Sequence, residues 1–140
     1  MNNSQQEFKD KNIAIIGLGY VGLPLAIEFG KKFKTCGFDI NKDRIDQLSK
    51  FEDSTECIES SEFNLSKYLT FSSDTSSIKD SNIYIVAVPT PLDSNNQPDL
   101  GNLKNACKII GELLNPNDIV IFESTVYPGA TEEVCVPILE

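Results

Sequence analysis

Short apolar runs alternate along this chain with longer segments in which apolar residues recur every three or four positions. The runs are almost continuously apolar, which is typical of strands that are covered on both faces. This alternation predicts an α/β domain with a parallel sheet. The predicted strands are Asn12–Ile16, Lys34–Asp39, Leu69–Ser72, Ile83–Val88 and Ile119–Glu123. The predicted helices are Tyr20–Lys32, Lys42–Ser49, Ser61–Tyr68, Ser76–Ser81, Leu100–Leu114 and Thr131–Leu139.

Polar residues mark the connections between these elements. Asp99 precedes a predicted helix and is placed to cap it. The segment Phe51–Ser60 is acidic and polar without a clear period, which predicts a surface loop. Thr90–Pro98 contains two prolines and two adjacent asparagines, so we expect an irregular loop after the fourth strand.

Three glycines with the spacing G-x-G-x-x-G lie between the first predicted strand and the first predicted helix, in IAIIGLGYVG. In this context Gly17 allows a tight turn, Gly19 lets a pyrophosphate approach the backbone, and Gly22 lets the helix pack closely on the sheet. The free amides and the dipole of the helix start would hold the diphosphate. The alternative is a plain turn that binds nothing. We interpret the motif as a dinucleotide-binding loop.

Asp39 ends the second predicted strand, 22 positions after Gly17. An acidic residue about 20 positions beyond the glycines accepts hydrogen bonds from the adenosine ribose, and its charge repels the 2′-phosphate of NADP. NAD is therefore the predicted cofactor. The alternative is that Asp39 only caps the turn into the helix Lys42–Ser49. Arg44 is close in sequence, and we expect it to lie over the adenosine side.

The other strand ends should contribute to the same site, because ligands of open parallel sheets bind beyond the carboxyl ends of the strands. Val86–Thr90 follows the fourth strand, and Ser124 and Thr125 follow the fifth. The hydroxyls of Thr90, Ser124 and Thr125 suit a nicotinamide ribose or a bound water. Ordinary turn and cap hydroxyls are the alternative, and the sequence alone does not decide between the two interpretations.

Composition excludes several classes of function. The formal net charge is −9 without a cluster of Lys and Arg, which argues against a nucleic acid or an anionic membrane as partner. The polar N-terminus and the lack of an apolar run of ~20 residues predict neither a signal peptide nor a membrane span, so we expect a cytoplasmic protein. The cysteines form no C-x-x-C and have no histidine partner, which predicts reduced thiols and no metal site. They are Cys36, Cys57, Cys107 and Cys135, of which we place Cys36 and Cys107 in the core.

Four motifs in order closely resemble the NAD-binding domain of the UDP-glucose/GDP-mannose dehydrogenase family: IGLGYVGLPLA, FDINKDRIDQL, VAVPTPLD…QPDL and ESTVYPGATEEVCVPILE. The resemblance extends from Lys11 to Glu140. Within the family, QPDL and ESTVYPG are more similar to the UDP-N-acetylhexosamine 6-dehydrogenases of surface-polysaccharide synthesis. The pattern and the resemblance together predict a Rossmann-like fold, a doubly wound parallel sheet with helices on both faces.

The resemblance also implies roles for single residues. It matches the pyrophosphate loop to Gly17, Gly19, Tyr20, Val21 and Gly22, the ribose ligand to Asp39, and the basic residue beside the adenosine to Arg44. It matches the NAD contacts of the fourth strand to Val86, Ala87, Val88, Pro89 and Thr90. It further implies a nicotinamide-side contact for Ser124, and for Thr125 the positioning of a catalytic water near C6 of the substrate.

Such enzymes oxidise the C6 hydroxyl of a UDP-hexose to a carboxylate in two NAD-dependent steps, through intermediates on a cysteine thiol. The family's nucleophilic cysteine lies in a glycine-rich motif followed by Pro-Lys-Asp, and no cysteine of this chain matches it. The central dimerisation helix and the nucleotide-sugar-binding domain are also absent from these residues, and the ending CVPILE resembles a truncation. We therefore expect residues 1–140 to be a dinucleotide-binding domain, inactive alone, of an enzyme that is a homodimer or a larger assembly.

Two other functions share parts of this pattern. A stand-alone NAD(H)-sensing domain would explain the missing nucleophile, but such a sensor has no evident need for VPTP or ESTVYPG. A 3-hydroxyacid or 6-phosphogluconate-type dehydrogenase would share the first βαβ unit, and the EST motif disfavours it.

The ribose hypothesis predicts a specific loss of affinity. Asp39→Ala should weaken NADH binding by about 1.5–3 kcal/mol, the usual value of a hydrogen bond to a charged group. Isothermal titration of both proteins with NADH measures the difference. An unchanged affinity would remove Asp39 from the site.

Overall fold

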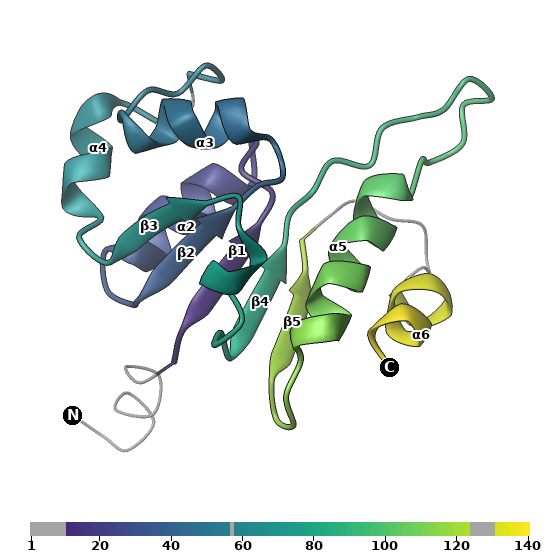
Figure 1. The fold of residues 1–140 in the computed structure, drawn as a ribbon. Coiled ribbons are helices and arrows are strands. Elements are labelled where there is room, and N and C mark those ends of the chain that lie inside the picture. The colour runs from purple at the N-terminus through teal and green to yellow at the C-terminus, as the bar shows by residue number, and fades with distance from the viewer. Residues whose placement is uncertain (1–10, 57, 124–130) are drawn as a thin grey trace.

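A computed structural model describes residues 11–56, 58–123 and 131–140. Its centre is a five-stranded sheet in the order β3-β2-β1-β4-β5, and every neighbouring pair is parallel (Figure 1). The strands are β1 (Ile13–Ile16), β2 (Thr35–Phe38), β3 (Leu69–Ser72), β4 (Ile83–Val86) and β5 (Ile119–Phe122). Their register is regular: Ile13 lies beside Thr35 on one side and beside Ile83 on the other. The predicted α/β class and parallel sheet are confirmed.

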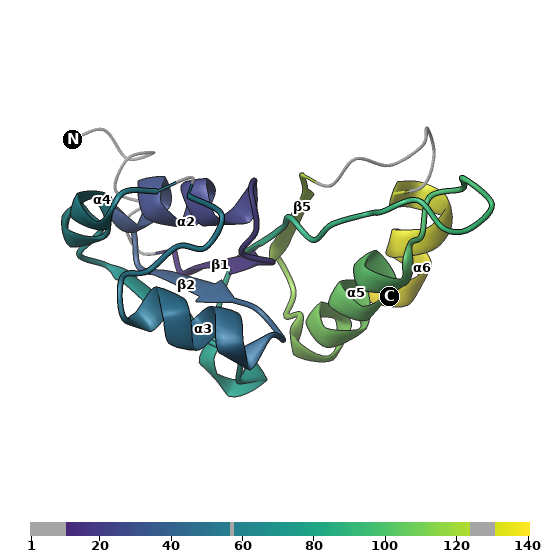
Figure 2. The same ribbon diagram turned by 90° about the horizontal axis from the view of Figure 1, so that it is seen from above.

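Helices cover both faces of this sheet (Figure 2). One face carries α2 (Gly22–Gly30) and α4 (Ser60–Leu65), and the other carries the 3₁₀ turn η1 (Thr75–Ser77) and α5 (Gly101–Leu113). The helix α3 (Lys42–Ser49) lies beyond the carboxyl ends of the strands, above the sheet in Figure 1. The chain ends in the π-helical turn η2 (Thr131–Cys135) and α6 (Val136–Leu139), which pack against α5. Among the described residues, no helix is long and apolar enough to cross a membrane.

Each face of the sheet has its own apolar core, because successive residues of a strand point to opposite faces. Ile13 and Ile15 of β1 pack with Leu23 and Ile27 of α2. Ala14 and Ile16 pack on the opposite face with Leu103, Ala106 and Ile110 of α5. The strands β1, β2 and β4 are buried along their whole length, which explains their continuous apolar runs.

Two predicted helices have a different form in the structure. Ser76–Ser81 is not an α-helix: only Thr75–Ser77 is helical, as a 3₁₀ turn in which Asp74 accepts a hydrogen bond from the amide of Ser76. The helix predicted at Thr131–Leu139 divides into η2 and α6 near Pro137. The proline ring clashes with the carbonyl group four residues earlier, so a single regular α-helix is disfavoured across this position.

The predicted cap of α5 is displaced by one residue. The formal N-cap of α5 is Leu100, whose side chain makes no cap. Asp99, the residue before it, accepts a hydrogen bond from the amide of Gly101 at 2.8 Å. The carboxylate therefore satisfies the first free amide of the helix, as a capping side chain does.

A buried tyrosine supplies a test of the α5-side core. Tyr84 is fully buried and donates a hydrogen bond to the carbonyl of Ile78 at 3.0 Å. Burial, together with the carboxylates of Asp118 and Asp80, raises the pKa of Tyr84 to about 12. The folded protein therefore keeps a proton that the unfolded chain loses above its ordinary pKa of about 10. The stabilisation by Tyr84 is complete below pH 10 and is lost as the pH rises toward 12.

Tyr84→Phe should lower the free energy of unfolding by about 1 kcal/mol near pH 8, through the lost hydrogen bond. The difference between wild type and variant should shrink between pH 10 and pH 12, because only the wild type has the titrating hydroxyl. Urea unfolding of both proteins at pH 8 and pH 11 measures it. A difference that stays constant across this range would contradict the assignment.

Candidate functional site

The winding of the sheet reverses between β1 and β4. From β1 the chain moves outward to β2 and β3, and it then returns to place β4 on the other side of β1. The carboxyl ends of β1 and β4 thus border a crevice, where open parallel sheets bind their ligands. A pocket of about 320 Å³ opens there, lined by Gly17–Gly19, Phe38–Asn41, Val88–Pro89 and one side of α5.

The three motif glycines have three different environments at this crevice. Gly17 has a φ of +96°, and a Cβ on it would lie 3.0 Å from the backbone of Ala87. A Cβ on Gly22 would collide with the carbonyl oxygen of Gly17. A Cβ on Gly19 would meet nothing within 4 Å. Gly17 and Gly22 are therefore required by the turn and its packing, whereas the space above Gly19 is open to a ligand.

The start of α2 presents free hydrogen-bond donors to this open space. The helix begins at Gly22 without a side-chain cap, and the loop before it contains no acidic side chain. Within the described residues, the amides of Gly19, Tyr20 and Val21 donate no hydrogen bond. Free amides at the positive end of a helix dipole form an anion-binding site. The loop therefore fits the diphosphate of a dinucleotide.

Asp39 lies at the carboxyl end of β2 and lines the pocket. Its Oδ2 accepts a hydrogen bond from the amide of Leu18 at 3.0 Å, and its Oδ1 accepts one from the amide of Asn41 at 2.9 Å. The turn contact that we considered as the alternative role is thus present. A carboxylate has about four acceptor positions, so these two contacts leave room for the hydroxyls of a ribose.

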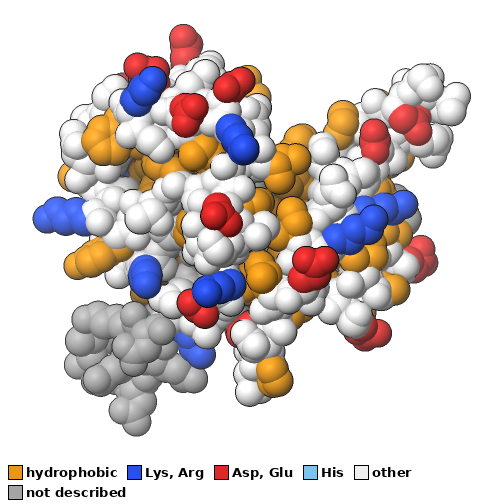
Figure 3. Space-filling view, in the orientation of Figure 1, with side chains coloured by type: hydrophobic (Ala, Val, Ile, Leu, Met, Phe, Trp, Pro, Cys, Tyr) orange, Lys and Arg blue, Asp and Glu red, His pale blue; other side chains and the backbone are white. Residues whose placement is uncertain are grey.

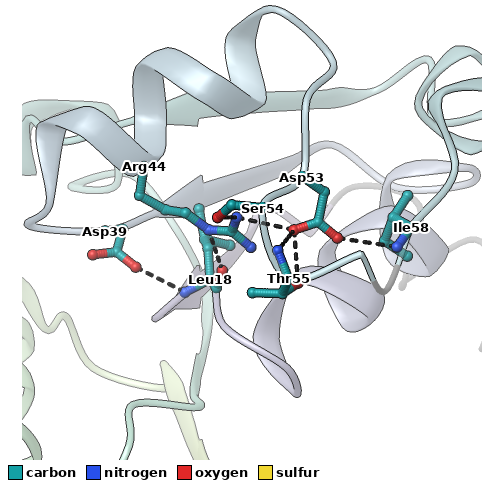
Figure 4. A network of polar contacts seen from close by, with 7 residues as sticks. All are labelled: Leu18, Asp39, Arg44, Asp53, Ser54, Thr55 and Ile58. Atoms are coloured by element: carbon teal, nitrogen blue, oxygen red, sulfur yellow. Dashed lines mark hydrogen bonds and ion pairs between the residues drawn. The ribbon is translucent and has the colours of Figure 1, made fainter.

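Arg44 lies in the first turn of α3 and is buried, with 8% of its surface exposed. Figure 4 shows its guanidinium between Leu18 and the segment that follows α3. Nε donates to the carbonyl of Leu18 at 2.8 Å, and Nη1 lies 2.9 Å from Oδ1 of Asp53. Nη1 also donates to Oγ of Ser54 at 3.3 Å. Arg44 lines the pocket, as a residue near the adenosine should, but its identified contacts are with the protein.

Asp53 belongs to the segment that we predicted to be a plain surface loop, yet its side chain is fully buried. It accepts hydrogen bonds from Thr55, Arg44 and Ile58. Burial alone would raise the pKa of the Asp53 carboxyl, but these hydrogen bonds outweigh it and lower the pKa below its usual value. Asp53 is therefore ionised opposite the Arg44 guanidinium at neutral pH.

The segment after β4 forms the other wall of the crevice. Ala87 is buried, and its amide donates to the carbonyl of Ile16. Val88 and Pro89 line the pocket, whereas Val86, the last residue of β4, and Thr90 are not among its lining residues. The cofactor contacts that we expect for Val86, Ala87, Val88, Pro89 and Thr90 remain predictions. Ser124 and Thr125 lie outside the described residues.

Sequence analysis missed the contribution of α5. Asn102, Asn105, Ala106 and Ile109 line the pocket from one face of this helix. Their spacing of three and four positions puts them on the same helical face. That spacing was readable in the sequence, but nothing there indicated that this face borders the crevice.

The described cysteines do not line the pocket, and its charged lining residues are Asp39 and Arg44. Figure 3 shows Lys and Arg scattered among Asp and Glu on this face, without a basic patch. Cys36 and Cys107 are buried as predicted, and Cys135 is buried as well. Burial raises the pKa of the Cys36 thiol and raises that of Cys107 to about 12, so both are unreactive thiols. Cys57 is not among the described residues, which contain no cluster of His, Cys, Asp and Glu able to hold a metal ion.

These features define a dinucleotide-binding domain: the strand order, the glycine loop with its free amides, and an acidic residue at the end of β2. The chain belongs to the UDP-glucose/GDP-mannose dehydrogenase family, and residues 11–140 match that family's NAD binding domain. NAD is thus the cofactor that this domain binds, in agreement with the carboxylate of Asp39 at the ribose position.

Characterised relatives agree with this assignment. The chain is 52% identical over 132 residues to the UDP-N-acetyl-D-glucosamine 6-dehydrogenase of Pseudomonas aeruginosa, which covers 94% of the chain and 31% of that enzyme. It is 47% identical over 131 residues to Protein CapL of Staphylococcus aureus, which covers 94% of the chain and 31% of that protein. The structure of a UDP-D-ManNAc dehydrogenase from Pyrococcus horikoshii superposes with a TM-score of 0.81 at 31% identity, over 91% of this chain and 31% of that one. The chain thus spans about a third of the length of these relatives.

The glycine environments predict two contrasting variants. Gly19→Ala should leave the fold intact, because its Cβ meets open space, but it should weaken NADH binding by about 1–3 kcal/mol through a methyl group in the path of the diphosphate. Gly22→Ala should instead destabilise the fold by about 3 kcal/mol, the upper end of the usual cost of overpacking, because its Cβ collides with a backbone carbonyl. Thermal unfolding and NADH titration separate the two effects. Equal melting temperatures for the two variants would contradict these assignments.

Proposed function

We propose that this chain is the NAD-binding domain of a nucleotide-sugar 6-dehydrogenase that oxidises the C6 hydroxyl of a UDP-N-acetylhexosamine to a carboxylate. The observation that carries the proposal is the glycine loop, whose free amides face open space beside Asp39. The 52% identity to the UDP-N-acetyl-D-glucosamine 6-dehydrogenase of Pseudomonas aeruginosa supports the choice of sugar nucleotide. We further propose that the working enzyme is a homodimer or a larger assembly that contains a nucleotide-sugar-binding part.

In this role the domain supplies binding and orientation, while bound NAD supplies a hydride acceptor for each oxidation step. The amides of Gly19, Tyr20 and Val21 hold the diphosphate, and Asp39 accepts hydrogen bonds from the adenosine ribose. The pocket floor of Phe38, Ala106 and Ile109 offers apolar surface to the adenine side. Thr125, which we expect to position a catalytic water, and Ser124, which we expect near the nicotinamide, complete the proposed set.

Because this domain binds the cofactor but contains no matching catalytic cysteine, the 140-residue chain should bind NADH without catalysing turnover. It should bind NADH, measured by the change in cofactor fluorescence, and it should reduce no NAD with any UDP-hexose, because no cysteine matches the family's nucleophile. Absent NADH binding would remove the cofactor site, and robust NAD reduction by the pure chain would contradict the proposed division.

A chimaera tests whether the domain serves this reaction. The chain replaces its matching 132-residue portion in the UDP-N-acetyl-D-glucosamine 6-dehydrogenase of Pseudomonas aeruginosa. The chimaera should reduce NAD with UDP-N-acetylglucosamine, and the same chimaera with Gly19→Ala should show a raised KM for NAD. A folded chimaera that binds NADH but gives no turnover would count against the proposed reaction.

A further inference from the structure

Arg44 and Asp53 connect the glycine loop to the segment between α3 and α4 (Figure 4). Asp53 does not line the pocket, and its carboxylate is shielded from solvent. It nevertheless holds the residue whose Nε bonds the backbone of Leu18, between the first two motif glycines. Asp53 is therefore connected to the cofactor loop through one intervening residue, Arg44.

The direction of the Gly19 amide depends on this connection. The carbonyl of Leu18 and the N–H of Gly19 belong to the same peptide unit, and in a trans peptide these two groups point in opposite directions. Nε of Arg44 holds the carbonyl at 2.8 Å, so the Gly19 N–H points away from Arg44. Within the described part of the chain this amide has no acceptor, so it is free for a ligand.

Contacts at the backbone and at the far end of the side chain fix the position of Arg44. Asp39 holds the amide of Leu18 and also the amide of Asn41, and Asn41 in turn caps the amide of Arg44 at 3.2 Å. At the far end of the side chain, Asp53 pairs with Nη1. Without Asp53, the guanidinium would keep only Ser54 as a partner for Nη1 among the identified contacts.

We propose that Asp53 is a positioning residue of the cofactor site, which acts through Arg44 on the Leu18 carbonyl and thereby aims the Gly19 amide at the diphosphate. The inference rests on the proposed NAD-binding function. It assigns to a residue in the segment 51–58 a role in cofactor binding although that residue touches no part of the pocket.

Asp53→Asn keeps the size of the side chain and removes its charge, so the hold on Arg44 weakens. We expect NADH affinity to fall about tenfold, the equivalent of one hydrogen bond to a charged group. Arg44→Lys should have a similar effect, because a single ammonium cannot reproduce the fork that bonds Leu18 and Asp53 together. The double variant should lose little more than either single variant, because both changes break the same connection.

Two matched comparisons separate positioning from a general loss of structure. Glu52→Gln removes the same charge from the adjacent residue, which is exposed and makes no side-chain contact with Arg44, so its NADH affinity should equal that of the wild type. ADP and adenosine serve as ligand probes that differ in the diphosphate. Asp53→Asn should weaken ADP binding about tenfold and leave adenosine binding within about twofold, whereas partial unfolding would lower both equally.

Calorimetry and NMR titrations of the wild type, the two single variants, the double variant and Glu52→Gln give these ratios, and melting temperatures show that each protein is folded. A wild type that binds no NADH would overturn the proposed function itself. A wild type that binds NADH, with Asp53→Asn losing ADP and adenosine equally or losing neither, would overturn only the positioning role. If Asp53→Asn does not fold, Thr55→Ala, which removes one donor from Oδ1 of Asp53, is measured in its place by the same ratio.

Discussion

Two side chains that follow β2 form hydrogen bonds with the backbone of Leu18, one with its N–H and one with its carbonyl. The conformation of the cofactor loop depends on these two contacts. The carboxylate of Asp39 takes its N–H and the guanidinium of Arg44 takes its carbonyl. One short sequence, Asp39–Arg44, therefore ends a strand, caps a helix and shapes the turn of a different strand. The same contacts explain how a chain with a net charge of −9 binds an anion. Local amides of fixed direction attract the diphosphate, although the overall charge repels it.

The backbone positions that require glycine were predictable from the sequence, because the spacing of the glycines in the motif determines them. The roles predicted for Gly17 and Gly22 follow from a strand-turn-helix connection that leaves no room for a Cβ, and a Cβ on Gly22 would indeed collide with the carbonyl of Gly17. The ends of α3 agree with the prediction residue for residue, since Asn41 supplies a cap and the apolar period is clear. The serine-rich segment before β4 was predicted less well, because Asp74 and its serines form local side-chain contacts that compete with a regular helix.

Side-chain partners were not predictable in the same way. Asp53 lies in a polar segment without a hydrophobic period. Its side chain is buried because it pairs with Arg44, which also donates a hydrogen bond to the carbonyl of Leu18. Asn105 and Ile109 border the pocket because α5 crosses the sheet where the winding reverses, which is a property of the whole fold. A motif therefore locates the phosphate loop, whereas the walls around it depend on packing between distant segments.

The energetics of the Arg44–Asp53 pair indicate what it contributes. Burying two charges costs desolvation energy that their attraction often fails to exceed, and well-packed apolar residues of similar volume hold a fold at least as well. Arg44 carries a further cost, since its Nη2 is buried without a hydrogen-bond partner in the described part of the chain. Apolar side chains could not hold a carbonyl oxygen in a set direction. The gain from the pair is therefore the orientation of the Leu18–Gly19 peptide, and this orientation matters only when a ligand accepts a hydrogen bond from the Gly19 amide.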